Sequence, residues 1–162
     1  MDIIFKIAIL ILLLVLSAFF SSAETAFNCA NEIRLKSLAE DGNKRAKAVL
    51  KILDNYSKLI SGILIGNNIV NIVASSLTTT LALLSGFSFA VSIATGALTI
   101  IILLCGEIIP KNWAKIKADK IVLFYAYFFR IYLTLFTPVI FLFNKTALIL
   151  MKILRINTKD DA

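Results

Sequence analysis

Long apolar stretches separated by charged segments define the pattern of this chain. After a first apolar stretch, an uncharged run extends from Leu59 to Cys105. As one helix this run would be roughly 70 Å long, more than twice a hydrocarbon thickness of about 30 Å. It must therefore turn back, and Ser85-Gly86 is the obvious place for a turn. The pattern predicts three spanning helices, at about residues 5–23, 59–84 and 89–106.

The first apolar stretch allows a second interpretation. Lys6 precedes it and small residues follow it, as in a secretory signal peptide. However, the stretch ends in Phe19-Phe20 and a polar Ser-Ser-Ala-Glu-Thr segment rather than an A-x-A cleavage site. We therefore expect an uncleaved spanning helix.

Residues 24–58 are strongly charged, with seven of the seventeen basic residues and five acids. Opposite charges recur four residues apart, which stabilises exposed helices. Gly42-Asn43 divides the segment and suits a helix end followed by a turn. The segment therefore predicts a polar, cytoplasmic helical hairpin. The pairs at this spacing are Glu32/Lys36, Glu40/Lys44 and Asp41/Arg45.

Residues 111–151 also allow two interpretations. Four lysines lie near the start, and the apolar and aromatic remainder is interrupted by Arg130, Pro138 and Lys145. A fourth span would export the basic tail, against the positive-inside rule. We therefore favour a juxtamembrane helical belt along the inner leaflet, with a full fourth span as the alternative.

The basic residues also predict the orientation. Most of them lie in the hairpin and between Lys111 and Lys120, which places both segments in the cytoplasm. Three spans then put the N-terminus outside and the C-terminus in the cytoplasm. The expected fold class is an all-α integral membrane protein of the plasma (inner) membrane.

Composition excludes several classes of protein. With 59% hydrophobic and 17% charged residues, the chain is too apolar for a soluble domain. The net charge of +7 is what basic residues flanking spans produce, so no nucleic acid partner is expected. Histidine is absent, which removes Ser-His and Cys-His nucleophiles and imidazole metal sites. We expect Cys29 and Cys105 to be buried small hydrophobes.

Two serines lie near the inner end of the first span. Ser17 and Ser21 are four residues apart and share one helix face. Serines in spanning helices often serve close packing, so a structural role competes with ligand binding.

Asparagines cluster in the second span. Gly62 and Gly66 form a GxxxG packing motif, and Asn67 and Asn71 follow on one side of the helix. Gly66 would let the helix loosen and expose a backbone carbonyl. Amide groups are costly in hydrocarbon, so they either bind a ligand or form interhelical hydrogen bonds.

The third span closes on a carboxylate. Glu107 follows Gly106, and Pro110 removes the donor that would normally bond the Gly106 carbonyl. A carboxylate beside a free carbonyl suits a cation; the alternative is that Glu107 marks the interface next to Lys111. Together the three clusters supply only oxygen donors. These suit Mg²⁺ or Na⁺, and not zinc or copper.

Three motifs carry a family resemblance. SAFFSSAETAF, GNNIVNI and GEIIPK follow one another in this order, with a basic hairpin after the first. This series resembles the transmembrane domain of the CNNM/CorC family. The resemblance implies a dimer with three spanning helices and a juxtamembrane belt. It also implies Mg²⁺ transport, generally as efflux coupled to Na⁺. We expect this domain over residues 1–155, and a linker or an artificial chain end over 156–162.

The resemblance also implies a ligand set. In the first motif the ligand falls on Ser21, with Ser17 next, while Ser22 stands where the family more often has glycine. The choice among these three serines stays open. The other implied ligands are Asn67, Asn71 and Glu107, with backbone carbonyls near Gly66 and Gly106.

We expect this chain to transport magnesium across the plasma membrane from an inward-facing site between the spans. The alternative is a Mg²⁺-sensing membrane scaffold that regulates other transporters without moving the ion. An enzyme is not expected, because Glu24 and Glu107 belong to different motifs. The resemblance also implies that a cytoplasmic CBS pair, and often a CorC-type domain, follows in the full-length protein.

Overall fold

A computed structural model describes residues 3–84, 86 and 89–154, and within these ranges it contains helices and turns but no strand. The expected all-α membrane fold is confirmed. The predicted linker at 156–162 lies outside the described residues. The helices are α1 (Ile3–Cys29), α2 (Glu32–Glu40), α3 (Lys44–Leu53), α4 (Tyr56–Leu83), α5 (Ala90–Ile101), the π-helix η1 (Ile102–Ile108), α6 (Ile109–Ile116), α7 (Ala118–Leu135) and α8 (Thr137–Ile153).

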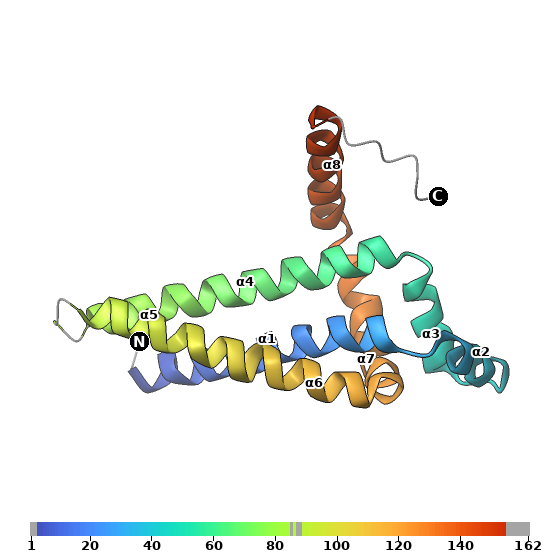
Figure 1. The fold of residues 1–162 in the computed structure, drawn as a ribbon, viewed down its shortest axis with the longest axis horizontal. Coiled ribbons are helices and arrows are strands. Elements are labelled where there is room, and N and C mark those ends of the chain that lie inside the picture. The colour runs from blue at the N-terminus through green and yellow to red at the C-terminus, as the bar shows by residue number, and fades with distance from the viewer. Residues whose placement is uncertain (1–2, 85, 87–88, 155–162) are drawn as a thin grey trace.

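Three long helical segments lie side by side and form the body of the molecule (Figure 1). They are α1, α4 and the continuous run Ala90–Ile116, and their 27, 28 and 27 residues suffice to cross a membrane. Their most apolar stretches are only 17%, 33% and 11% buried within the chain. Such exposed apolar surface requires a lipid or protein environment. The chain is therefore a multi-pass membrane protein with the three spans that the sequence predicts.

The turn between the second and third spans contains Gly86. Its φ of 73° lies in the left-handed region, which glycine adopts without steric cost. The predicted turn at Ser85-Gly86 is therefore confirmed at Gly86, while Ser85 lies outside the described residues.

The charged hairpin is shorter than predicted. It occupies α2 and α3, because α1 continues as a helix to Cys29. Asn31 and Asn43 cap the two helices with their side-chain oxygens, and Gly42 makes the turn with a φ of 91°.

Only one predicted ion pair forms in the hairpin. Lys36 and Glu32 lie 2.8 Å apart, both within α2. The pairs Glu40/Lys44 and Asp41/Arg45 are absent from the described ion pairs. They straddle the turn between the helices, where the i,i+4 geometry of a helix does not apply.

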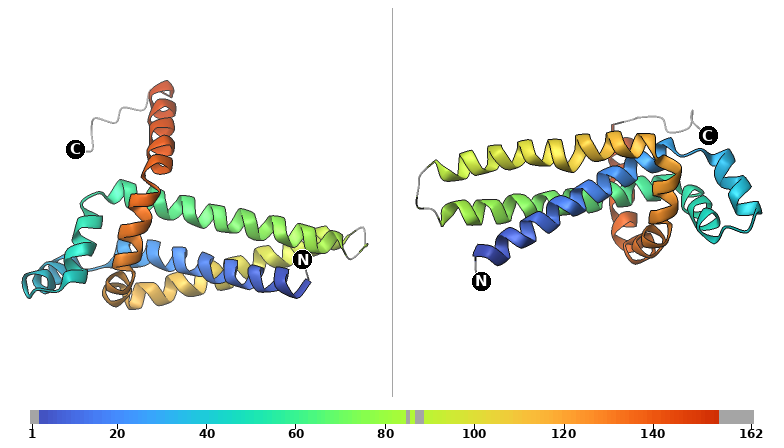
Figure 2. Two further views of the ribbon diagram at one scale, coloured as in Figure 1. Left: turned by 180° about the vertical axis from the view of Figure 1, so that it is seen from behind. Right: turned by 90° about the horizontal axis from the view of Figure 1, so that it is seen from below.

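The last two helices do not follow the direction of the three spans. α7 crosses the bundle, and α8 stands away from it, as two views show (Figures 1 and 2). The two helices meet at an angle of 70°, so together they could count as one broken span by length and composition. Their crosswise course agrees with a belt, whose position at the membrane surface stays a prediction.

An aromatic cluster holds α7 against α1. Phe129 is fully buried, and its ring lies 5.7 Å from that of Phe19 and 5.5 Å from that of Phe27. Tyr125 and Tyr132 pack beside it. Edge-to-face and offset contacts of this kind stabilise beyond the burial of apolar area. The cluster fixes α7 at the end of α1 where the serine motif lies.

The expectation for the two cysteines is wrong, since both are exposed. Cys29 is the last residue of α1, and Cys105 lies on the outer side of the π-helix. Cys105 needs no burial on an apolar surface that faces lipid, and Cys29 lies at the end of α1, where the bundle no longer covers it.

Candidate metal site

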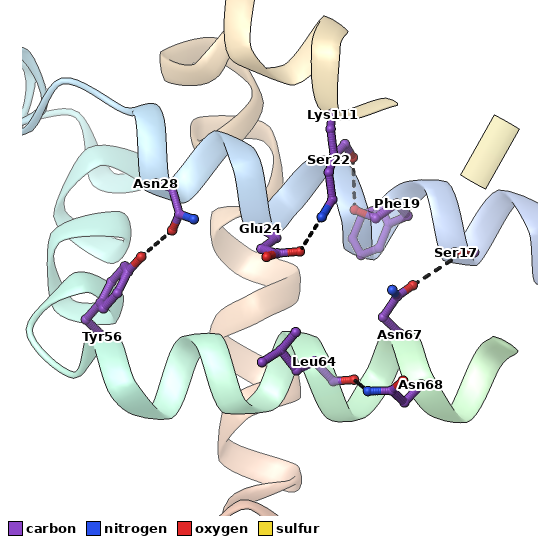
Figure 3. A network of polar contacts seen from close by, with 10 residues as sticks. All are labelled: Ser17, Phe19, Ser22, Glu24, Asn28, Tyr56, Leu64, Asn67, Asn68 and Lys111. Atoms are coloured by element: carbon purple, nitrogen blue, oxygen red, sulfur yellow. Dashed lines mark hydrogen bonds and ion pairs between the residues drawn. The ribbon is translucent and has the colours of Figure 1, made fainter. Parts of the chain in front are cut away.

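The three serines of α1 are all buried, but their hydroxyl groups have different partners. Ser17 Oγ donates to Asn67 Oδ1 over 3.3 Å (Figure 3). Ser22 Oγ donates to the Phe19 carbonyl over 2.9 Å and lies 3.0 Å from the Tyr125 hydroxyl. Ser21 Oγ has no partner in the described part of the chain. The Ser22 hydroxyl is therefore used in hydrogen bonds within the chain, whereas the Ser21 hydroxyl oxygen has no described partner.

The asparagines of α4 divide in the same way. Asn68 is exposed, and its amide donates to the Leu64 carbonyl over 2.9 Å (Figure 3). Asn67 and Asn71 are half-buried, and the Asn71 side-chain oxygen is buried with no described partner. Asn67 and Asn71 are thus the two asparagines whose oxygens lie inside the bundle.

Helix α4 does not loosen at Gly66, contrary to expectation, and continues as an α-helix from Tyr56 to Leu83. Gly66 instead permits close packing. A Cβ there would lie 2.6 Å from the Phe20 ring and 2.7 Å from the Tyr132 hydroxyl oxygen. The same hydroxyl donates to the Gly62 carbonyl over 2.9 Å. The GxxxG face of α4 is therefore covered by α1 and α7 of the same chain.

The third span loosens where the sequence places Glu107. Residues 102–108 form a π-helix, and the N–H of Ile109 bonds to the carbonyl of Leu104, five residues back. Pro110 follows directly and lacks the N–H that would restore the α-helical pattern at Gly106. The disturbance of the helix that Pro110 predicts therefore extends over the whole π-helical segment, residues 102–108. Such π-helical turns often occur at functional sites.

Three polar segments meet beside this turn. A Cβ on buried Gly106 would lie 3.0 Å from Ser17 Oγ, so the π-helix approaches α1 closely at Ser17. Ser17 in turn bonds to Asn67 on α4. The structure therefore brings together Ser17, Asn67 and Gly106 from the three spans. No hydrogen bond joins them to Ser21, Asn71 or Glu107 among the described residues.

Glu107 has no cationic partner in the described part of the chain. It is half-buried and forms no ion pair or hydrogen bond with another described residue. Lys111, the neighbour expected to accompany it, lies 3.0 Å from Glu24 instead (Figure 3). An unpaired carboxylate within a spanning segment is costly, so Glu107 is a candidate functional residue.

The donor set consists of hydroxyl, amide and backbone carbonyl oxygens and one carboxylate. The described residues contain no group of three His, Cys, Asp or Glu side chains that could hold a metal. Oxygen ligands with a single carboxylate suit a hard cation that keeps part of its hydration shell.

Some residues around the site could not be found from sequence motifs. The hydroxyl groups of Tyr125 and Tyr132 reach the serine and glycine motifs from α7, more than fifty residues away. The ion pair between Glu24 and Lys111 likewise joins distant segments. Their only sequence signal was the presence of polar tips on otherwise apolar helices.

The fold and the site define a class: a multi-pass helical membrane domain with a polar, oxygen-lined centre between its spans. Residues 8–162 match the family described as "CNNM: Cyclin M transmembrane N-terminal domain". The chain belongs to this family, as the sequence motifs predict.

Similar proteins occur in bacteria and plants. The chain is 42% identical to a UPF0053 protein of Haemophilus influenzae over 90% of its length, and 38% identical to the UPF0053 inner membrane protein YfjD of Escherichia coli over 88%. A chloroplastic DUF21 domain-containing protein of Arabidopsis thaliana is 39% identical over 70% of the chain and 17% of its own length. The chain covers 34% and 33% of the two bacterial relatives.

Proposed function

We propose that this domain transports Mg²⁺ across the plasma membrane, as efflux coupled to Na⁺ entry. In this proposal the ion binds between α1, α4 and the π-helix. Its ligands are side-chain oxygens of Ser21, Ser17, Asn67, Asn71 and Glu107, assisted by the backbone carbonyls of Gly66 and Gly106.

Two buried oxygens carry the proposal. Ser21 Oγ and Asn71 Oδ1 have no partner within the described chain, although both are shielded from solvent. An unsatisfied buried polar atom costs about 1–3 kcal/mol, and lipid outside the bundle offers it nothing. A bound cation, or a water that it holds, would satisfy an atom of this kind.

Charge supports the same ion. Glu107 is the one carboxylate in the proposed set, and Lys111 does not neutralise it because Lys111 pairs with Glu24. Mg²⁺ commonly uses one or two carboxylates and keeps several waters. A single carboxylate leaves net positive charge, which favours release over permanent binding.

The remaining expectations form part of the proposal. The N-terminus lies outside, and the hairpin and the C-terminus lie in the cytoplasm. The domain forms a homodimer within the membrane, and a cytoplasmic CBS pair accompanies it in the full-length protein. The π-helix supplies a segment that can rearrange while α1 and α4 stay regular, as alternating access requires.

A flux assay tests the proposal. The protein is reconstituted into liposomes with a Mg²⁺-sensitive dye, and flux is compared with and without an opposing Na⁺ gradient. Glu107→Ala abolishes flux, whereas Glu40→Ala, an exposed carboxylate on α2, does not. Unchanged flux in Glu107→Ala refutes the site. Mg²⁺ binding without flux in the wild type supports a sensing scaffold instead.

A further inference from the structure

A basic cavity of about 420 Å³ lies outside the proposed Mg²⁺ site. The helices that form it meet at the end of the bundle that carries α2 and α3 (Figure 1). Its walls come from the ends of α1 and α6 and the starts of α2 and α7. The cationic side chains among its lining residues are Arg34, Lys115, Lys117 and Lys120. Asp119 is the one carboxylate among them, so four positive charges and one negative give a net charge of +3.

Asp119 offsets only one of the four positive charges, because its oxygens already have donors. One oxygen accepts the backbone N–H of Asn31 over 2.9 Å, and the other lies 3.2 Å from the Arg34 guanidinium. This double contact fixes the start of α2 against α7 and holds Arg34 at the cavity. The lysines remain without a described anionic partner there.

The cavity opens beside an apolar surface. Ile116 and Trp113 on α6 are 81% and 50% exposed, and α6 continues the third span. Lys117 Nζ lies 5.9 Å from the centre of the Trp113 ring, within the range of a cation–π contact. Exposed tryptophan next to lysine at the end of a span is typical of the membrane–water interface.

We propose that this cavity binds the phosphate of an anionic phospholipid in the leaflet on the hairpin side. The net charge of +3 attracts an anionic headgroup, and basic pockets at the ends of spans recognise such headgroups. The exposed side chains of Trp113 and Ile116 give the acyl chains an apolar path away from the cavity. The occupant is therefore a lipid rather than free phosphate, which would leave that surface uncovered.

The first turn of α7 adds donors at the same place. α7 begins at Ala118, and no described side chain caps it. The first N–H groups of an α-helix have no intrahelical partner, and without a side-chain cap those of α7 favour an anion placed among the lysines.

Trp113 is the single tryptophan of the chain and reports on this cavity. The protein is reconstituted into phosphatidylcholine vesicles that contain brominated phosphatidylglycerol or, separately, brominated phosphatidylcholine. Quenching of Trp113 then gives the ratio of the two lipid association constants. The variant Lys115→Gln/Lys120→Gln is compared with Lys44→Gln/Lys47→Gln, which removes the same charge from exposed positions on α3.

The wild type prefers phosphatidylglycerol. The cavity variant lowers the preference about 30-fold, from about fivefold for each cation lost near an anionic surface, and the α3 variant retains it. An equal decrease in both variants overturns the proposal, because the attraction is then diffuse. Absence of any preference, with a Trp113 emission shift in inorganic phosphate that the cavity variant loses, also overturns it and indicates free phosphate.

Discussion

Lys111 Nζ lies 3.0 Å from a carboxylate oxygen of Glu24, and this ion pair joins α6 to α1 (Figure 3). On an ideal helix Lys111 would face Glu107, four residues earlier. The π-helix intervenes, and Lys111 turns to Glu24 instead. Glu107 is therefore left without a cationic partner beside the polar centre, where the proposed cation binds.

Removing the partner of Lys111 tests this division of charges. Glu24→Gln releases the Lys111 ammonium, which then competes for Glu107 and weakens Mg²⁺ binding. We expect an affinity loss on the order of fivefold, from about 1 kcal/mol for a partly exposed pair. Isothermal titration of purified protein measures it. Adding Lys111→Gln to Glu24→Gln restores the affinity, and equal affinity in the wild type and Glu24→Gln contradicts the account.

The adjacent serines predict opposite outcomes. Ser22→Ala loses the hydrogen bonds to Phe19 and Tyr125 and lowers the free energy of unfolding by about 1 kcal/mol, while Mg²⁺ binding persists. Ser21→Ala loses no hydrogen bond within the described chain, so its stability is unchanged or higher, but Mg²⁺ binding weakens. Thermal unfolding in detergent and Mg²⁺ titration measure the two effects. Weaker Mg²⁺ binding in Ser22→Ala, with unchanged binding in Ser21→Ala, would contradict the roles that we assign to the two serines.

Two glycines provide a matched test of packing. Gly66→Ala places a methyl group 2.6 Å from the Phe20 ring and lowers stability by about 1–3 kcal/mol. In Gly96→Ala the new methyl group meets nothing within 4 Å. Because alanine is the better helix former, this variant raises the free energy of unfolding by up to about 1 kcal/mol. Thermal unfolding of both variants separates steric crowding from helix propensity. A stable Gly66→Ala would show that α4 and α1 are less closely packed.

The sequence predicts the spans well because their signal is local. The uncharged run to Cys105 and the glycine at position 86 determine a helix pair and its turn without reference to the rest of the chain. The end of the first helix was predicted less accurately, because the polar residues after Ser22 resemble the start of the hairpin. They remain in α1 because the aromatic cluster of α7 covers Phe27.

The site was predictable by residue type and less so by geometry. Motif spacing identifies Ser17 and Asn67, which a hydrogen bond joins in the structure. It cannot show that the Ser22 hydroxyl contacts the hydroxyl of a tyrosine 103 residues away. It predicted disturbed helices at both Gly66 and Pro110, whereas α4 stays regular and only the third span is disturbed. Glycine allows loosening or close approach, and only the neighbouring rings of Phe20 and Tyr132 decide which occurs.

The central claim is that a hard cation binds between the three spans. Mn²⁺ accepts the same oxygen ligands as Mg²⁺ and gives an anomalous signal in crystals, so it locates the ion directly. The account predicts one strong peak beside the π-helix, within coordination distance of Glu107 and of Ser21 or Asn71. The peak disappears in crystals of Glu107→Ala. A Mn²⁺-soaked wild-type crystal with no peak among these residues would contradict the account.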